Sequence, residues 1–267
     1  MIHRAIPART LATGDRMPLL GLGVWQLRSG RECEDAVGWA LEAGYRHVDT
    51  ARLYGNEASV GRAMAASGVP REEVFLTTKL LPRTLDVRRH LHESLEALQT
   101  DYVDLYLVHW GSPLADEQWL ALEEAHRDRL ARAIGVSNFS ATQLRHTAGL
   151  GEVVPHVDQV EFSPFSFREG LLRTCEELGC AFESYSPLTR GRRLTHPVVG
   201  RIAREHGRTP AQVLLRWCVQ REVAVIPKSA HRERIVENAA IFDFALTPED
   251  VAALDGLDTT GRTDRAR

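Results

Sequence analysis

Four residues of the chain have side chains that together could deliver a proton to a carbonyl oxygen. Asp49 ends the segment HVD, Lys79 lies near the end of VFLTTKL, His109 ends YVDLYLVH, and Tyr54 follows shortly after Asp49. A phenol titrates at about pH 10, which is high for a proton donor at neutral pH. A buried lysine beside Tyr54 would lower that pKa, and a carboxylate would keep the lysine charged and oriented. These residue types therefore indicate general acid catalysis by Tyr54.

The same residues could serve structure alone, as an Asp–Lys ion pair with a tyrosine packed in the core. A single histidine at a strand end is also more often structural than catalytic. Other apolar segments, however, end in polar residues too, and these are Ser137 with Asn138, Gln159, Tyr185 and Lys228. In a parallel barrel such ends converge on the face that carries the active site, and this convergence favours catalysis.

The elements that must position these residues alternate along the chain. The predicted strands are 20–23, 47–49, 74–79, 103–109, 133–137, 157–162, 181–184 and 223–226. The predicted helices are 31–43, 56–67, 84–98, 116–130, 141–149, 168–178, 197–206 and 232–240, with another after Thr209 and a last one at 248–256. Ser140, Thr209-Pro210 and Thr247-Pro248 are typical helix starts.

Eight such units in 267 residues predict an α/β fold, a (β/α)₈ TIM barrel with a short N-terminal hairpin and extra C-terminal helices. A doubly wound sheet is the competing architecture. The turn at Gly21 and Gly23 is not a Rossmann fingerprint, because Gln26 occupies the third glycine position. No linker or repeat divides the chain, so residues 1–267 are expected to form one domain.

Composition narrows the class of protein further. The net charge is −3 without a long basic run, so neither nucleic acid nor a membrane is an expected partner. The four cysteines form no CxxC motif, and no metal site is expected. The N-terminal segment has no long apolar region of the signal-peptide kind. We expect a cytoplasmic protein that is a monomer.

Four segments, in order, carry a resemblance to a known family. AGYRHVDTARLYGNE contains Asp49 and Tyr54, FLTTKL contains Lys79, and DLYLVHW contains His109, after an opening GLGVWQL. Together they resemble the aldo-keto reductase family over roughly residues 14–257, and in particular bacterial members of the 2,5-diketo-gluconate reductase type. The resemblance implies NADPH-dependent reduction of aldehydes or ketones, with Asp49, Tyr54, Lys79 and His109 as the catalytic residues.

The resemblance also implies how the NADPH cofactor and a small carbonyl substrate would bind. Ser137, Asn138 and Gln159 would contact the nicotinamide carboxamide, and Tyr185 would stack on the ring. The remaining cofactor contacts implied are Gly23, Val24, Asp49, Ser186, Pro187, Leu188, Lys228, Ser229, Arg234, Glu237 and Asn238. Lys228, Ser229 and Arg234 would face the 2′-phosphate. Trp25, Tyr54, His109 and Trp110 would line the substrate pocket.

Some features differ from many relatives. His231 replaces a threonine near the expected 2′-phosphate, and the loop after Trp110 and the C-terminal tail are short. These two segments set substrate choice, so no particular substrate is implied. Two alternatives remain, a lyase that uses Lys79 as a Schiff-base nucleophile and a non-catalytic barrel that senses the nicotinamide cofactor. Borohydride trapping would separate the first from a reductase, and turnover on a carbonyl panel would separate the second.

Overall fold

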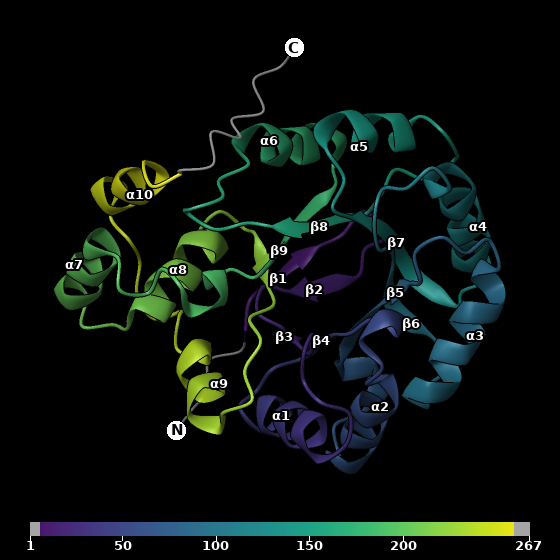
Figure 1. Ribbon diagram of the computed structural model, residues 1–267, viewed down its shortest axis with the longest axis horizontal. Helices are drawn as coiled ribbons and strands as arrows, with labels where there is room; N and C mark the ends of the chain where they lie inside the picture. The colour runs from purple at the N-terminus through teal and green to yellow at the C-terminus, as the bar shows by residue number, and fades with distance from the viewer. Residues whose placement is uncertain (1–5, 259–267) are drawn as a thin grey trace.

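The computed structural model of the protein describes residues 6–258, and its main sheet has eight parallel strands in chain order. These strands are β3 (Leu22–Gly23), β4 (His47–Asp49), β5 (Phe75–Leu80), β6 (Val103–Val108), β7 (Ala131–Ser137), β8 (Val157–Glu161), β9 (Ala181–Tyr185) and β10 (Ala224–Val225). Leu20 bridges Val225 in parallel, and the Gly21 amide donates to the Val225 carbonyl at 2.8 Å. The sheet therefore closes on itself as a (β/α)₈ barrel, seen end-on in Figure 1.

Helices surround this barrel (Figure 1). They are α1 (Arg31–Glu42), α2 (Glu57–Ala66), α3 (Val87–Leu98), α4 (Ala115–Arg127), α5 (Ala141–Ala148), α6 (Glu169–Leu178), α7 (Pro197–Glu205), α8 (Pro210–Val219), α9 (Arg232–Ala239) and α10 (Pro248–Asp255). Helix α7 precedes the crossover helix α8, and α10 packs beside α7. The His206 imidazole and the Asp250 carboxylate, 2.7 Å apart, join α10 to the end of α7. None of the helices within residues 6–258 is long and apolar enough to cross a membrane.

The predicted elements are all present, and the differences lie at their ends. The first and last strands are two residues each, against four predicted, because backbone pairing beyond them is limited to the Leu20–Val225 bridge. Helix α3 begins at Val87 instead of residue 84, where the Asp86 side chain accepts a hydrogen bond from the Arg89 amide. A side-chain cap of this kind fixes the first helical residue.

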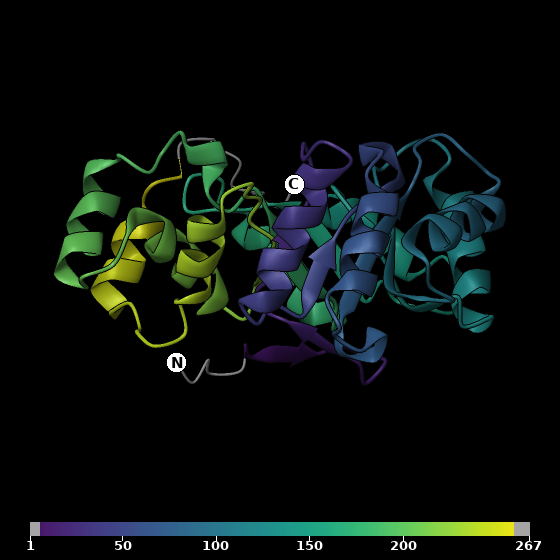
Figure 2. The ribbon, with the colours of Figure 1, turned by 90° about the horizontal axis from the view of Figure 1, so that it is seen from below.

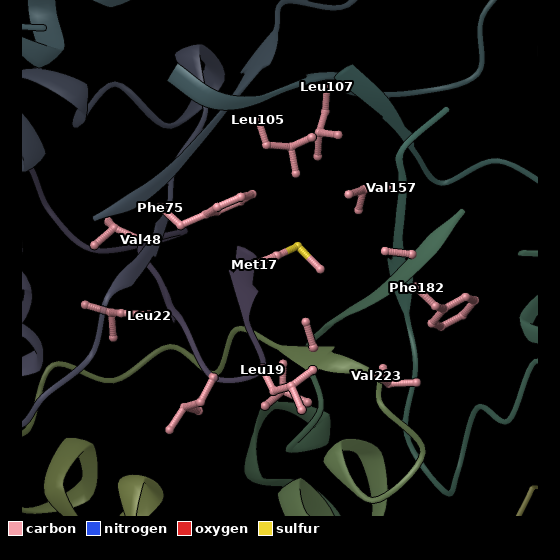
Figure 3. Packing of buried hydrophobic residues seen from close by; sticks show 14 of the residues in the cluster. Met17, Leu19, Leu22, Val48, Phe75, Leu105, Leu107, Val157, Phe182 and Val223 are labelled. Atoms are coloured by element: carbon pink, nitrogen blue, oxygen red, sulfur yellow. The ribbon is translucent and has the colours of Figure 1, made fainter. Parts of the chain in front are cut away.

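The predicted N-terminal hairpin closes one end of the barrel. It consists of β1 (Ala8–Thr10) and β2 (Arg16–Pro18), paired antiparallel with Arg9 opposite Met17. Figure 2 shows it lying across the lower end of the barrel. Met17 is fully buried and lies among Phe75 and Val157, the first residues of β5 and β8 (Figure 3). This end of the barrel is therefore filled with apolar side chains. We expect the active site at the opposite end, where the strands have their carboxyl ends.

Two helical glycines offer a matched test of how tightly α2 packs on α3. Alanine is intrinsically favoured over glycine in a helix by about 1 kcal/mol. A Cβ on Gly38 in α1 would meet no atom within 4 Å, whereas a Cβ on Gly61 in α2 would lie 2.6 Å from the Leu98 carbonyl oxygen at the end of α3. The two substitutions should therefore have opposite effects.

We expect Gly38→Ala to raise the free energy of unfolding by up to about 1 kcal/mol. Gly61→Ala should lower it by about 1–3 kcal/mol, because backbone atoms cannot move aside as a side chain can. Urea denaturation followed by circular dichroism measures both. Equal effects of the two substitutions would show that α2 and α3 are not in close backbone contact.

Candidate active site

A fully buried lysine lies at the centre of the open end of the barrel. Lys79, on β5, has 0% of its side chain exposed. Its Nζ donates to both carboxylate oxygens of Asp49, at 2.6 and 2.8 Å, and to the Thr50 carbonyl at 2.9 Å. Burial alone would lower the pKa of Lys79, but the Asp49 carboxylate and the nearby Tyr54 outweigh it, so the pKa is raised. Lys79 is therefore a permanent cation, and this state is unsuitable for a Schiff-base nucleophile.

Tyr54 completes a chain of polar contacts with this ion pair. It lies at the end of a short 3₁₀ helix, Arg52–Tyr54, and its hydroxyl is 3.3 Å from Lys79 Nζ. Burial raises the pKa of Tyr54 and the Lys79 charge lowers it, with a net increase. The sequence-based expectation of a lowered pKa was thus right about the effect of Lys79 but wrong about the sum, because desolvation is the larger effect. At neutral pH the phenol keeps its proton.

His109 faces Tyr54 across the mouth of the barrel. The two ring centroids are 5.8 Å apart in an edge-on arrangement, and His109 stacks on Trp110 at 6.2 Å. Burial, together with the Lys79 charge, lowers the pKa of His109 to about 3. The imidazole is therefore neutral over the physiological range, and it can donate one hydrogen bond from one ring nitrogen.

Four polar side chains from β7, β8 and β9 form a connected group beside the ion pair. Gln159 Nε2 donates to Asp49 Oδ2 at 2.7 Å and to Glu183 Oε2 at 2.8 Å. Ser137 Oγ donates to the Gln159 carbonyl at 2.8 Å and accepts from Asn138 Nδ2 at 3.0 Å. The Tyr185 hydroxyl donates to Asn138 Oδ1 at 2.6 Å. The structure thus brings together Ser137, Asn138, Gln159 and Tyr185, which the sequence analysis singled out.

Asn56 is a positioning residue that the sequence analysis did not select. It is buried, its Nδ2 donates to the carbonyls of Val24 and Leu27 at 2.9 and 3.1 Å, and its Oδ1 accepts from Thr50 Oγ1 at 3.0 Å. Asn56 therefore ties the loop that follows β3 to the loop that carries Tyr54. The signal was present, since Asn56 belongs to the quoted segment AGYRHVDTARLYGNE.

The rim of the site exposes large apolar side chains. Trp25 is 39% exposed and Trp110 48% exposed, which is unusual for tryptophan. The Arg190 guanidinium lies over the Trp25 ring at 4.8 Å, so the loop after β9 reaches the loop after β3. Exposed aromatic side chains around a polar centre are typical of a ligand site.

Other expected cofactor residues lie near the start and end of the barrel sheet. Val24 is buried, with its amide bonded to the Asp49 carbonyl, and a Cβ on Gly23 would lie 2.7 Å from the Ile226 carbonyl oxygen. Only glycine therefore fits at position 23, where β3 approaches the end of β10. Ser186, Pro187 and Leu188 follow β9 directly, and Ser186 has a left-handed backbone with φ 51°.

The segment after β10 presents charge at the start of α9. Lys228 and Arg234 are exposed, and within residues 6–258 Arg234 has no ion-pair partner, whereas Arg232 pairs with Glu42 at 3.1 Å. The Ser229 hydroxyl accepts from the His231 amide at 3.1 Å and shapes this turn. The Glu237 carboxylate accepts from the Thr209 hydroxyl at 2.7 Å, and Asn238 is buried on α9.

No group of three or more possible metal ligands occurs among the residues that the structure describes. The cysteines Cys33, Cys175, Cys180 and Cys218 are all buried free thiols. Burial raises the pKa of Cys33 and Cys218 to about 12, so neither is a thiolate nucleophile at neutral pH.

Comparison with known proteins identifies the family of the chain. The family model described as Aldo/keto reductase family matches residues 19–259, and the chain belongs to this family. It is 46% identical to an aldo-keto reductase of Mycobacterium sp. (strain MCS), over 95% of this chain and 91% of that protein. It is 43% identical to glyoxal reductase of Bacillus subtilis (strain 168), over 94% and 93% of the two chains.

A solved structure shows the same fold. The chain is 36% identical to Bombyx mori aldo-keto reductase in complex with NADP, with a TM-score of 0.89 over 96% of this chain and 94% of that one. As a member of the family, the protein is an oxidoreductase that acts on small-molecule carbonyl compounds.

Each charge of the buried Lys79–Asp49 pair should depend on the other for its stability in the folded protein. Removing one partner of a buried ion pair costs about 3–5 kcal/mol, because the other charge stays buried without compensation. We expect Asp49→Asn and Lys79→Met each to lower the free energy of unfolding by this order, and the double variant to lose clearly less than their sum.

A double-mutant cycle by urea denaturation at pH 7 measures this coupling. The exposed pair Arg31–Asp35 in α1, at 3.4 Å, is the matched control and should couple by no more than about 0.5 kcal/mol. A coupling free energy between Asp49 and Lys79 as small as that of the control pair would show that the two charges do not form a buried ion pair.

Proposed function

We propose that the protein reduces aldehydes or ketones to alcohols with NADPH, and that Tyr54 is the general acid. The observation that carries the proposal is the 3.3 Å contact between the Tyr54 hydroxyl and a lysine that is itself paired with Asp49. A protonated phenol next to a fixed cation can release its proton as negative charge develops on a carbonyl oxygen. The neutral His109 opposite it would donate a second hydrogen bond that orients this oxygen.

The hydrogen-bonding capacity left in the polar group suits a nicotinamide carboxamide. Gln159 directs its amide nitrogen at the carboxyl oxygens of Asp49 and Glu183, so its carbonyl oxygen remains as an acceptor. The donors of Ser137 and Asn138 are also used within the protein. The residues that the sequence analysis assigned to the carboxamide therefore fit its NH₂ group, and Tyr185 offers a ring beside them.

Bound NADPH would supply a hydride to the carbonyl carbon. The chain's own residues would do the rest of the work. Lys79 and Asp49 would hold the Tyr54 hydroxyl in place and stabilise the phenolate that remains after proton transfer. Trp25 and Trp110 would cover the reacting carbonyl and exclude water from it. This division of roles leaves the positive charge of Lys79 unchanged throughout the reaction.

The substrate class we propose is small aldehydes and α-dicarbonyl compounds. The rim exposes apolar rings with few polar anchors, so it would bind many small carbonyl compounds weakly. The similarity to a glyoxal reductase supports the same class. Buried free thiols agree with a reducing compartment such as the cytoplasm as the place of the reaction.

Tyr54→Phe should lower turnover by about 10²–10⁴-fold, because it removes the proton donor and leaves the ring in place. Cofactor affinity, measured by NADPH fluorescence titration, should stay nearly unchanged. Methylglyoxal or another small aldehyde serves as the substrate in a steady-state assay of NADPH oxidation. If the variant keeps more than half of the wild-type turnover, Tyr54 is not the acid.

Arg234→Ala should weaken NADPH binding roughly ten-fold or more and leave NADH binding nearly unchanged. A guanidinium can hold the 2′-phosphate with two charge-assisted hydrogen bonds, each worth about 1.5–3 kcal/mol. The matched control is Arg232→Ala, which removes the same charge from the same helix but from a residue paired with Glu42. Equal wild-type affinity for both cofactors, or equal effects of the two substitutions, would overturn this assignment.

A further inference from the structure

Glu183 is a buried carboxyl group for which the proposed hydride and proton transfers have no use. It lies on β9 inside the barrel, two residues before Tyr185, and it is fully buried. Its Oε2 accepts from Gln159 Nε2 at 2.8 Å, and its Oε1 has no hydrogen-bond partner within residues 6–258. The imidazole nitrogen His47 Nε2 lies 3.4 Å from Oε1.

The hydrogen bonds of His47 determine where a proton must be. Its Nδ1 lies 3.2 Å from the Pro18 carbonyl oxygen, which can only accept, so Nδ1 carries a hydrogen. In a neutral ring Nε2 is then an acceptor, and it faces the acceptor Oε1 of Glu183. Nε2 also lies 3.4 Å from Thr77 Oγ1, whose hydroxyl can donate to it. The unpartnered Oε1 thus faces a ring nitrogen that has no hydrogen to give, and this favours a proton on the Glu183 carboxyl group.

This proton belongs to Glu183 at neutral pH. Burial and the neighbouring Asp49 charge raise the pKa of Glu183 to about 8, while burial lowers the pKa of His47 to about 4. The other groups that act on Glu183 are Gln159 on β8 and Lys79 on β5. With the proton present, the Asp49–Lys79 pair is electrically balanced; without it, the interior carries one uncompensated negative charge.

We propose that Glu183 is a titratable positioning residue that couples its own protonation to the oxidation state of the bound nicotinamide. This inference rests on the proposed function, because it takes Gln159 and Tyr185 as nicotinamide contacts. Gln159 gives its two N–H groups to Asp49 and Glu183, so it connects the cofactor position to this proton. Protonated Glu183 does not discriminate between the two oxidation states by charge. Ionised Glu183 favours the positively charged nicotinamide of NADP⁺, and its proton leaves to solvent.

The direction of the pH effect follows from these charges. Below about pH 8 Glu183 is neutral and does not discriminate by charge; above it, the carboxylate attracts the cation. The ratio of the NADP⁺ to the NADPH dissociation constant should therefore fall as pH rises from 6.5 to 9. A shift of one pKa unit in Glu183 on NADP⁺ binding corresponds to a fall of about ten-fold. Titration of the 2′-phosphate affects both cofactors and cancels in the ratio.

The test compares wild type with Glu183→Gln, in the full chain, by fluorescence titration of NADPH and calorimetric titration of NADP⁺. Glutamine keeps the size of the side chain and can accept from Gln159 and donate to His47, but it cannot ionise. The ratio should be independent of pH in this variant and equal to the low-pH ratio of wild type. Tyr54→Phe is the second control, and it should keep the wild-type pH dependence, because Tyr54 is not the titrating group.

An unchanged pH dependence in Glu183→Gln would overturn the proposal. If that variant does not fold, infrared difference spectra of wild type at pH 8 decide, since NADP⁺ should diminish the band of a protonated carboxyl group and NADPH should not. Equal effects of both cofactors on that band would also overturn it. Failure of wild type to bind either cofactor would instead contradict the proposed function.

Discussion

The burial of one positive charge inside an apolar barrel is the constraint on which the site depends. A lysine with no exposed surface is stable only if its charge is paired and its hydrogen bonds are satisfied. Lys79 meets this demand through both oxygens of Asp49 and the Thr50 carbonyl. Asp49 and Thr50 are consecutive residues at the end of β4, so the pairing also fixes the start of the loop that carries Tyr54. The geometry of the candidate site is thus a consequence of charge compensation.

One end of the barrel interior is apolar and the other is polar, so the candidate site lies at the polar end. The hairpin and Met17 fill the end where the strands begin with apolar side chains. Inward-facing residues become polar toward the other end, where His47, Glu183 and then Asp49 and Lys79 lie. A polar group inside a barrel must find partners within it, because no water replaces them. The interior network of hydrogen bonds therefore extends from the reactive end toward the apolar plug.

Loops around the mouth are held by side chains and not by the strands alone. Asn56 joins the loops that follow β3 and β4, and Arg190 lies over Trp25 from the loop after β9. Neighbouring loops that restrain one another keep the side chains of the candidate site in a narrow range of positions, and the proposed proton transfer requires such preorganisation. The exposed rings of Trp25 and Trp110 leave few polar anchors at the rim, and this fits the proposed binding of small substrates of different shape.

The sequence by itself determined the local features of this protein. The alternation of apolar segments and helix starts such as Ser140 and Thr209 located the eight units to within about three residues at each end, because a strand, a cap or a turn depends on neighbours in the chain. Polar strand ends likewise predicted Asp49 and Lys79 as a pair. Tertiary structure alone decided what depends on distant residues: the Leu20–Val225 closure, the contact of His47 with Glu183, and the net pKa of Tyr54. The closure and the contact depend on the register of the strands around the barrel, and the pKa depends on the depth of burial. No short segment of the sequence encodes either property.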